Sequence, residues 1–454
     1  MFTFRQAYLM KREAENAAWI KSYPERAEKE FYLRDGTFDI LDDITPEDNL
    51  VRAWTEYGTK TQDAYPEYHT AAMLVLISHL FPATMKPQYA SKGVNNNMWC
   101  IILGNSGCGK SMACGAAVSL AYEEKIMPYF SRISNKFTPE SLTQSLSESR
   151  RRFHYSNEAV GFLKNMKRDY AGELPEDITN AYDGERVSKQ TMKMGIVSCD
   201  HPLYSGLWNT TIDSWSKNAT EDGFASGMFM RPFFIISTRA REIKKDSAID
   251  PKTVKIRTDI VDYLADLLGL VHGDPVDGQI YHPKVIVFAE SEYINNWKYG
   301  LRVDGNNGKY SELEQSTLQR VFDQARKIAM NLTIASSEFM NHVMYLPPYK
   351  GNLPVMNDEI HYEIPDYIAE YACYIAECVF WKNSIKALKA TYSTGVYSKV
   401  MRALEGNKKL TKSEIGDMVN LHGKHLTEVL DDLGLSHKEE RILGKCRPVT
   451  YYWK

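Results

Sequence analysis

The stretch GNSGCGKS (residues 104–111) fits the pattern G-x-x-x-x-G-K-[ST], which is typical of loops that bind phosphate groups. Because the pattern is short, its context decides what it forms. The preceding WCIIL (99–103) predicts a buried strand, and the following KSMACGAAVSLAYEE (110–124) predicts a helix with small residues near its start. Strand, glycine-rich loop and helix is the order that a phosphate-binding loop requires; a plain glycine-rich turn is the alternative.

Each part of this loop has a physical role. Three glycines let the backbone curl so that its N–H groups point at phosphate oxygens, and the helix N-terminus adds favourable partial charge. Lys110 can reach the β and γ phosphates of a nucleotide, and the Ser111 hydroxyl can bind Mg²⁺. We therefore predict ATP and Mg²⁺ as cofactors. The predicted binding residues are Gly104, Asn105, Ser106, Gly107, Cys108, Gly109, Lys110 and Ser111.

A phosphate loop needs an acidic partner on a neighbouring strand, and HYSNEAVGFL (154–163) supplies the best candidate. Glu158 would orient and polarise the attacking water. Asn157 stands where such sites usually carry an aspartate that holds the Mg²⁺ shell, so metal binding should be weakened but not abolished. The residues before it are not a clean apolar run, which keeps an exposed helix-cap glutamate open as the alternative. Asp183 and Asp200 are the reserve acids.

Two polar residues end the apolar run in VSCDHPLYSGLWNTT (197–211). Asn209 and Thr210 lie where a polar side chain could sense the γ-phosphate. The alternative is an ordinary turn at the end of a strand, where Asn and Thr are common.

One arginine precedes an apolar strand in EDGFASGMFMRPFFIIS (221–237). From this place Arg231 could reach the γ-phosphate of a neighbouring subunit and stabilise transition-state charge. The alternative is a surface salt bridge to Glu221 or Asp222.

The composition is that of a soluble globular protein. The chain has 454 residues, 43% hydrophobic and 25% charged, and a formal net charge of -3, so any surface that faces DNA must be local. Its 7 cysteines include no C-x-x-C pair, which argues against a zinc site of the usual spacing and suggests a reducing compartment. The longest apolar run (71–81) is too short to span a bilayer, and the N-terminus lacks a signal-peptide pattern. We expect a cytoplasmic protein without a membrane partner.

The chain divides into four regions on these patterns. Residues 1–66 are polar and helical, and a second helix at about 68–80 has apolar residues spaced to cover one face. Residues 67–240 alternate short apolar runs with segments of helical pattern, which predicts an α/β core around the loop. Residues 241–390 are mostly helical and lid-like, and residues 391–454 form a separate small domain.

The order of several short motifs resembles a known family. GNSGCGKS is followed by FTPESL, SNEAVGFL, AYDGE, LYSGLWNTT and GFASGMFMRPFF. Together they resemble a P-loop ATPase family of phages, plasmids and integrated mobile elements, whose primase-helicase-like members are similar to AAA+ and superfamily-3 helicase motors. The resemblance covers residues 68–388; the loop marks a superfamily, while FTPESL (137–142) and YDG (182–184) narrow it. It implies an α/β fold, with a P-loop (AAA+/RecA-like) ATPase core, helical flanking regions and a C-terminal winged-helix domain.

The resemblance assigns roles to the candidate site residues. Lys110 and Ser111 match the phosphate-loop pair, Glu158 the catalytic acid, Asn209 the sensor and Arg231 a finger that acts in trans. Asn157 departs from the family's usual aspartate, which puts the rate of hydrolysis in doubt more than nucleotide binding. Arg320 or Arg326 could be a second sensor, with helix-surface charge as the alternative.

Such motors form rings, so the resemblance implies a homo-oligomer, a hexamer with DNA in its central channel. The segment ERVSKQTMKMG (185–195) lies where superfamily-3-like motors carry a hairpin that touches DNA. Lys189 and Lys193 could contact phosphates there, each a non-specific and salt-sensitive contact; a solvated charged loop is the alternative. The short N-terminal region shows no primase motif, so a primase would be a partner.

The C-terminal text is typical of a winged helix. It predicts helices at 396–404 and from Thr411, the latter with a capping box between Thr411 and Glu414. Residues 423–433 are the candidate recognition helix, and residues 441–453 alternate like a two-stranded wing around Gly444 and Lys445.

A winged helix can lay its third helix in a DNA groove. Lys424 and His425 would then face DNA, while Lys445 and Arg447 would hold phosphates. The alternative is docking to a protein, because acidic residues crowd the far end of the helix: Glu428, Asp431 and Asp432.

The leading interpretation is an ATP-dependent DNA motor, a replicative helicase of a phage or mobile element that acts as an oligomeric ring. A second is a helicase loader or a DNA-assembled regulatory ATPase of transposition or defence. A third is a DNA-binding switch that binds ATP without hydrolysing it, because of Asn157.

Overall fold

The computed structural model describes much of the chain in two compact units. One unit is Met1–Thr211 with Gly227–Ile385, and the other is Ile212–Ser226 with Lys386–Lys454. The described residues are 48–86, 93–166, 173–191, 195–219, 223–224, 227–237, 250–273, 275, 284–310, 312–345, 359–392, 404, 409–419, 426–427, 430, 436–440 and 449–453. Most of the predicted N-terminal helical region therefore lies outside the described residues.

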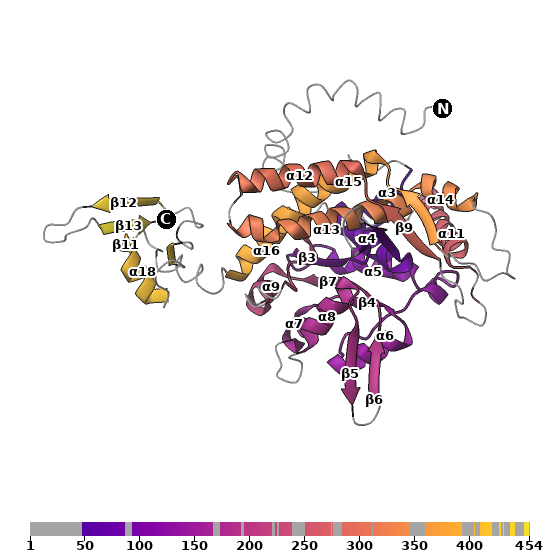
Figure 1. Cartoon of the computed structure of the whole chain (residues 1–454), viewed down its shortest axis with the longest axis horizontal. Coiled ribbons are helices and arrows are strands. Elements are labelled where there is room, and N and C mark those ends of the chain that lie inside the picture. Colours follow the sequence, from indigo (N-terminus) through magenta and orange to yellow (C-terminus); the bar gives the residue numbers. More distant parts are fainter. Residues whose placement is uncertain are drawn as a thin grey trace, which may run out of the picture. The chain divides into compact units, whose positions relative to one another are not determined.

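A four-stranded parallel sheet forms the centre of the first unit (Figure 1). Its strands, in spatial order, are β4 (Arg151–Ser156), β7 (Leu203–Thr210), β3 (Trp99–Gly104) and β8 (Phe233–Ser237). Every residue of β3 is buried, as expected for a central strand of a parallel sheet covered on both faces. The predicted strand before the loop is therefore confirmed, and so is a mixed α/β architecture with parallel sheets flanked by helices.

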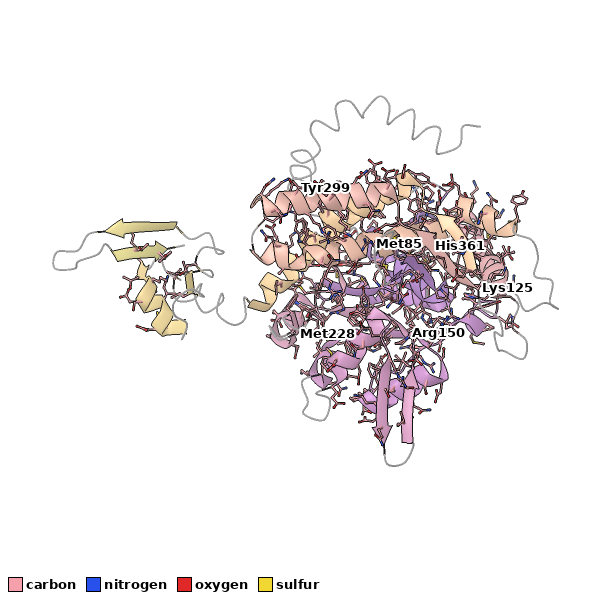
Figure 2. All side chains as sticks on the ribbon, in the orientation of Figure 1. Met85, Lys125, Arg150, Met228, Tyr299 and His361 are labelled. Atoms are coloured by element: carbon pink, nitrogen blue, oxygen red, sulfur yellow. The ribbon has the colours of Figure 1, made fainter. Side chains whose placement is uncertain are left out.

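Helices connect and cover these strands. Those in the first half are α3 (Leu50–Thr61), α4 (Pro66–Leu80), α5 (Lys110–Leu120), the 3₁₀ turn η1 (Met127–Tyr129), α6 (Pro139–Glu148), α7 (Val160–Asn165) and α8 (Leu174–Asp183). Those in the second half are α11 (Pro251–His272), α12 (Glu292–Asn306), α13 (Glu312–Ile334), α14 (Ser337–Met344), α15 (Asp366–Ile375), the π-helical segment η3 (Ala376–Trp381) and the first residues of α16 (Lys382–Tyr392). Side chains fill the space between these elements (Figure 2).

The predicted helix near residues 68–80 exists as α4, but it is buried on all sides rather than on one face. Two of its hydroxyl groups form hydrogen bonds inside the protein. The Thr70 and Thr55 hydroxyls are 2.7 Å apart, and the backbone N–H of Met98 donates to Ser78 Oγ at 3.2 Å. The expectation of one apolar face was wrong because α4 packs between α3, α5 and the parallel sheet.

A second sheet joins distant parts of the sequence. It consists of β10 (Glu359–Glu363), β9 (Val285–Ala289), β1 (Ala83–Lys86) and β2 (Val94–Asn95), in that order. The first three strands run parallel, and β2 is antiparallel to β1. The region expected to be mostly helical thus also contributes two strands, and the expected boundary near residue 240 does not separate compact units.

Three buried histidines pack among these elements. Burial lowers the pKa of His154 to about 3, with a smaller contribution from the charge of Arg132. Its Nδ1 accepts from Trp208 Nε1 at 3.0 Å. Burial, followed by the charge of Arg151, also lowers the pKa of His272 to about 3 and that of His79 well below its ordinary value. All three imidazoles are therefore neutral in the folded protein at neutral pH.

We predict that acid destabilises the protein below about pH 6.5 through these histidines. The unfolded chain binds their protons near its ordinary pKa while the folded chain does not, so stability falls as the pH falls. Each histidine should remove about 1.4 kcal/mol of unfolding free energy between about pH 7.5 and about pH 5.5. Chemical denaturation at the two pH values measures this. Equal stability at both pH values would contradict the prediction.

The second unit contains α9 (Ile212–Asn218), the rest of α16, β11 (Leu410–Thr411), α18 (Lys412–Val419), β12 (Ser436–Glu440) and β13 (Val449–Trp453). The strands form an antiparallel sheet in the order β11-β13-β12. The indole of Trp215 in α9 donates to the Ala387 carbonyl at 3.1 Å. Residues 212–226, expected in the core, therefore belong with the C-terminal residues.

The predicted capping box is confirmed. Thr411 Oγ1 accepts from the N–H of Glu414 at 3.2 Å, and Glu414 Oε2 accepts from the N–H of Thr411 at 2.7 Å. The helix itself begins one residue later, at Lys412.

The paired strands near the C-terminus differ from the expected wing. β12 pairs with β13 from Ser436↔Trp453 to Glu440↔Val449, so the first strand lies before the predicted start at residue 441. The connecting residues, with Lys445 and Arg447, lie outside the described residues, as do Lys424 and His425. Of the two predicted helices at 396–404 and 423–433, the structure describes Leu404 and helical turns at Leu426, Thr427 and Leu430.

Candidate functional site

The carboxyl ends of three parallel strands bring the predicted site residues together. Leu103 of β3 lies beside Thr210 of β7, and Trp208 of β7 lies beside Ser156 of β4. The loop after β3, the end of β7 and the turn after β4 therefore meet at one edge of the sheet. In open parallel sheets this carboxyl edge is where ligands bind.

The loop after β3 has a backbone that its glycines make possible. Gly107 and Gly109 have φ values of +78° and +85°, in the left-handed region that favours glycine. A Cβ on Gly109 would also lie 2.7 Å from the Cα of Ala64. Gly104 has ordinary φ, but a Cβ there would lie 2.7 Å from the Tyr68 hydroxyl. The loop is thus tightly curled, with its tip open to solvent at Asn105, Ser106 and Gly107.

Lys110 is the first residue of α5 and lies beneath this loop. Its residue is 8% exposed, and its ammonium donates to the carbonyls of Gly104 at 2.8 Å and Asn105 at 2.7 Å. A phosphate oxygen at the loop would replace one of these carbonyls as acceptor. Ser111 follows with its side chain exposed at the same end of the helix.

Glu158 follows β4 and is held by the neighbouring strand. Thr210 Oγ1 donates to Glu158 Oε1 at 3.1 Å. The alternative role as a helix cap does not apply, because α7 begins after Ala159 and has no side-chain cap. The strand that looked poor in the sequence is real, and its inward residues Phe153 and Tyr155 are buried. Glu158 therefore occupies the place expected of the acidic partner.

Asn157 is engaged by a neighbour that the sequence did not indicate. The hydroxyl of Tyr155 donates to Asn157 Oδ1. Burial, and the nearby Cys114, raise the pKa of this phenol, so it stays protonated as a donor. An aspartate oxygen at position 157 could receive the same bond, whereas the present amide adds no negative charge to the edge.

Asn209 lies fully buried between the loop strand and the Glu158 strand. The Cys114 thiol of α5 donates to its Oδ1 at 3.2 Å, and burial raises the pKa of that thiol to about 12. Nδ2 of Asn209 has no hydrogen-bond partner among the described residues. Leaving a buried N–H donor without an acceptor costs about 1–3 kcal/mol of stability. A ligand at this edge that accepts a hydrogen bond from Nδ2 would therefore be stabilised.

Arg231 lies at the opposite, amino edge of the sheet, two residues before β8. Its side chain is 7% exposed and forms a two-pronged pair with Asp183, with Nη2–Oδ2 at 2.6 Å and Nε–Oδ1 at 3.2 Å. Its Nη1 donates to the Gly227 carbonyl at 2.5 Å. The expected role of Arg231 as a finger toward a neighbouring subunit does not fit this arrangement, because all three nitrogens are bound within its own subunit.

The reserve acids also lie away from the loop. Asp183 ends α8 beside Arg231, and Asp200 precedes β7 at the amino edge, where it pairs with Arg186 at 3.5 Å. Neither carboxylate can replace Glu158 as the acidic partner of the loop.

The two candidate second sensors are at this amino edge as well. Arg326 is buried in an ion pair with Glu290, while Arg320 is 28% exposed and lies 3.7 Å from Asp323. Because the loop lies at the carboxyl edge, neither arginine is placed to sense a nucleotide bound there by the same chain.

The expected hairpin is present between β4 and β7. β5 (Val187–Thr191) and β6 (Gly195–Cys199) pair in antiparallel fashion and project from the sheet (Figure 1). Lys189 is held by α8 and the residue before it, 2.9 Å from Asp177 and 2.5 Å from Glu173. DNA phosphates would have to compete with these carboxylates for Lys189. Lys193 lies outside the described residues.

Sequence reasoning missed the residues that support the site from other elements. Tyr68 of α4, Cys114 of α5 and Tyr155 of β4 contact the loop, Asn209 and Asn157 respectively. From the sequence, each of these residues would be interpreted as an ordinary buried core residue of its own helix or strand. Their role arises from tertiary packing, which leaves no local signal.

Comparisons with known proteins add no family assignment. No protein-family model matches the chain, and a search of curated proteins finds no match either. In the described part of the chain, no cluster of three or more His, Cys, Asp or Glu side chains is arranged to hold a metal ion. The described helices include none that is long and apolar enough to cross a membrane.

Proposed function

We propose that this chain is an ATPase that acts as a motor on DNA. The observation that carries the proposal is the convergence at the carboxyl edge of the parallel sheet. There the curled loop with Lys110, the Glu158 carboxylate held by Thr210, and the Asn209 amide lie at the ends of adjacent strands. Nδ2 of Asn209 has no hydrogen-bond partner among the described residues. This combination fits the P-loop (AAA+/RecA-like) core that the sequence motifs predict.

The residues at this edge fit ATP with Mg²⁺. The exposed loop backbone and the N-terminus of α5 would hold phosphate oxygens, and Lys110 would leave the loop carbonyls to join them. The Ser111 hydroxyl, with Asn157 nearby, would hold Mg²⁺. Bound ATP·Mg²⁺ would supply the transferable phosphoryl group and its charge neutralisation. Glu158 would orient the attacking water, and Asn209 Nδ2 would donate to the γ-phosphate.

DNA is the substrate of the proposed motor. The β5–β6 hairpin projects from the sheet, and Ile196 near its tip is 69% exposed, which suits insertion between bases or strands. The second unit, proposed as a winged helix, would add DNA contacts through Lys424, His425, Lys445 and Arg447. We further propose a cytoplasmic, hexameric ring that unwinds DNA for replication, with a primase as its proposed partner. Strand displacement separates this helicase from a loader or a regulatory ATPase.

One observation favours a second function for the same site. Tyr155 donates to Asn157 Oδ1, so the side-chain oxygen that residue 157 offers to a metal ion is neutral and already accepts a hydrogen bond. Such a site could bind ATP and hydrolyse it only slowly. The chain would then be a nucleotide-dependent switch that assembles on DNA.

The first test is ATP turnover by the purified chain, with and without single-stranded DNA. We expect DNA to stimulate ATP turnover. We expect Lys110→Ala to reduce turnover to the background rate of the assay, because the ammonium group that would bind the phosphates is lost. Lys125→Ala is the matched control, since Lys125 is 68% exposed and pairs with Asp262 at the surface.

The outcomes separate the two functions. Turnover that disappears in Lys110→Ala and persists in Lys125→Ala supports the motor. ATP binding without turnover, with turnover restored by Asn157→Asp, supports the switch. No ATP binding by the unmodified chain would refute both.

A further inference from the structure

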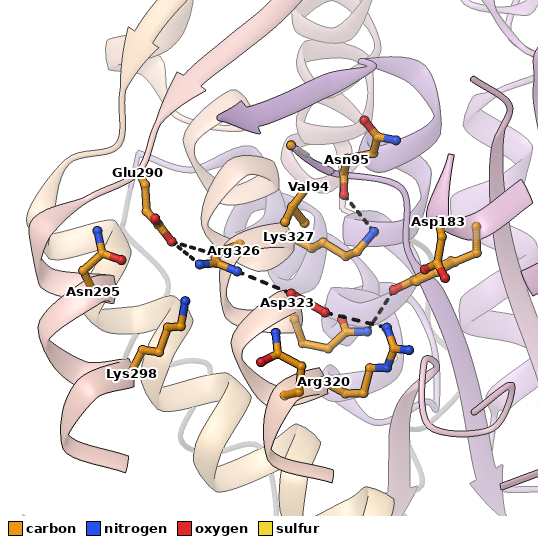
Figure 3. A pocket seen from close by; sticks show the side chains of 14 residues that line it. Val94, Asn95, Asp183, Glu290, Asn295, Lys298, Arg320, Asp323, Arg326 and Lys327 are labelled. Carbon is orange, nitrogen blue, oxygen red and sulfur yellow. Dashed lines mark hydrogen bonds and ion pairs between the residues drawn. The ribbon is translucent and has the colours of Figure 1, made fainter. Parts of the chain in front are cut away.

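A charged cavity of about 490 Å³ lies at the amino edge of the parallel sheet, away from the loop (Figure 3). It is bounded by α12, α13, the end of α8 and the residues around β2. Its charged lining residues are Asp183, Glu290, Lys298, Arg320, Asp323, Arg326 and Lys327. These charged residues do not take part in the candidate nucleotide site at the carboxyl edge, so that site does not explain them.

Arginines neutralise all three carboxylates of this cavity. Asp183 forms an ion pair with Arg231, which is not itself a lining residue of the cavity. The Arg326 guanidinium binds Glu290, and both side chains are at most 5% exposed. Asp323 lies between Arg326 at 3.4 Å and Arg320 at 3.7 Å.

Two lysines of the cavity have no carboxylate partner among the described residues. Lys298 points into the cavity and makes no hydrogen bond or ion pair to a described residue (Figure 3). Lys327 is 3% exposed, and its ammonium donates to the carbonyls of Asn95 and Asn97 at 2.7 and 2.8 Å without a carboxylate partner. Burial lowers the pKa of Lys327 to about 7, while Asp323 and Asp183 oppose the shift. An anion that enters the cavity would compensate the charge of Lys298 and would favour the protonated form of Lys327.

The cavity also offers free hydrogen-bonding groups of both kinds. Arg320 makes one long ion pair and no hydrogen bond to a described residue, so most of its donors are available. Gln324 is 1% exposed; its Nε2 donates to the Tyr182 hydroxyl at 3.1 Å, while its Oε1 has no partner among the described residues. The ligand therefore needs several acceptor oxygens and at least one donor.

We propose that this cavity binds a phosphate group. A phosphate offers acceptor oxygens in several directions for Lys298 and Arg320, and its protonated oxygen or an adjoining hydroxyl can donate to Gln324 Oε1. The phosphate has two possible sources, a free phosphoanion or the nucleotide held on the loop of a second copy of this chain. The first source is independent of the proposed function, and the second rests on it.

The first experiment titrates inorganic phosphate into the Lys110→Ala protein, whose loop no longer supplies its lysine, and follows binding by calorimetry. For a free phosphoanion we expect one saturable site per chain. Arg320→Gln and Lys298→Gln should each weaken it at least about 10-fold, the loss typical of one charge-assisted hydrogen bond. Arg257→Gln is the control for Arg320, because Arg257 is similarly exposed at 32% and pairs with Glu123 at the surface.

The second experiment tests the other source by mixing two inactive variants. Lys110→Ala leaves the cavity intact but removes the lysine of the loop. Arg320→Gln leaves the loop intact but removes one phosphate-binding side chain of the cavity. If the phosphate comes from a second copy, the mixture should regain ATP turnover while each variant alone has little. Saturable phosphate binding lost in Arg320→Gln supports the first source, and recovery in the mixture supports the second. If phosphate does not bind and the mixture stays inactive, the proposal fails, whether or not the unmodified chain hydrolyses ATP.

Discussion

Replacing Arg231 by methionine should lower the free energy of unfolding by about 3 kcal/mol. The substitution keeps much of the side-chain volume but leaves the Asp183 carboxylate without its partner. Burial opposes ionisation of Asp183, yet the hydrogen bonds and charge of Arg231, followed by the charges of Arg320 and Lys327, keep its pKa below the ordinary value. We expect the lower end of the range for broken buried pairs, because the Asp183 side chain is 26% exposed. Chemical denaturation at neutral pH measures the loss.

The double variant Arg231→Met with Asp183→Asn is the control for this prediction. It removes both charges, so it should recover most of the lost stability; a buried pair replaced as a whole is often near neutral. A loss in Arg231→Met below about 0.5 kcal/mol, the scale of surface substitutions, would show that the pair is not a buried structural contact. If Arg231→Met is instead stable and lacks the ATP turnover of the unmodified oligomer, the result would support Arg231 as a finger toward a neighbouring subunit.

The loop and its neighbours were predictable because their signals are local. The glycines, Lys110 and Ser111 occupy one continuous stretch, and the apolar run before them identifies the strand. Glu158 and Asn209 were predictable as well, since each follows a strand, and parallel strands place their carboxyl ends at the same edge. Side chains that approach from other elements, such as Tyr155 toward Asn157, gave no such signal.

The amino edge could not be predicted for the same physical reason. Arg231 and Asp183 are 48 positions apart, and the hydrogen bonds of Lys327 span more than 200 positions. The second sheet likewise pairs strands that begin at residues 83, 285 and 359. From the sequence, Asp183 was a reserve acid and Arg320 and Arg326 were candidate sensors, and nothing indicated that these charges share one cavity. Gln324, Lys327 and Asn331 recur at helical spacing, and this polar series is the one available hint of a buried polar face.

Glu158→Gln should reduce ATP turnover by about 10² to 10⁴-fold while ATP binding is retained. The amide keeps the size of the side chain and can still accept from Thr210, but it cannot take a proton from the attacking water. Binding is retained because the phosphate contacts come from the loop and Lys110, on a different strand of the sheet. Turnover at saturating ATP, together with the dissociation constant of a fluorescent ATP analogue, measures the two effects separately.

Two further variants make this prediction specific to the geometry. Glu148→Gln is the control, because Glu148 is 60% exposed on α6 and interacts with Arg152 and Gln144 away from the carboxyl edge; its turnover should not change. Thr210→Val removes the hydroxyl that holds the Glu158 carboxylate, and it should cost about 10-fold, the loss expected for one hydrogen bond to a charged group. The two effects should not add, because in Glu158→Gln there is no base left for Thr210 to position. If Glu158→Gln instead weakens ATP binding and leaves turnover at saturation intact, Glu158 contributes to holding the nucleotide and the base must lie elsewhere on the carboxyl edge.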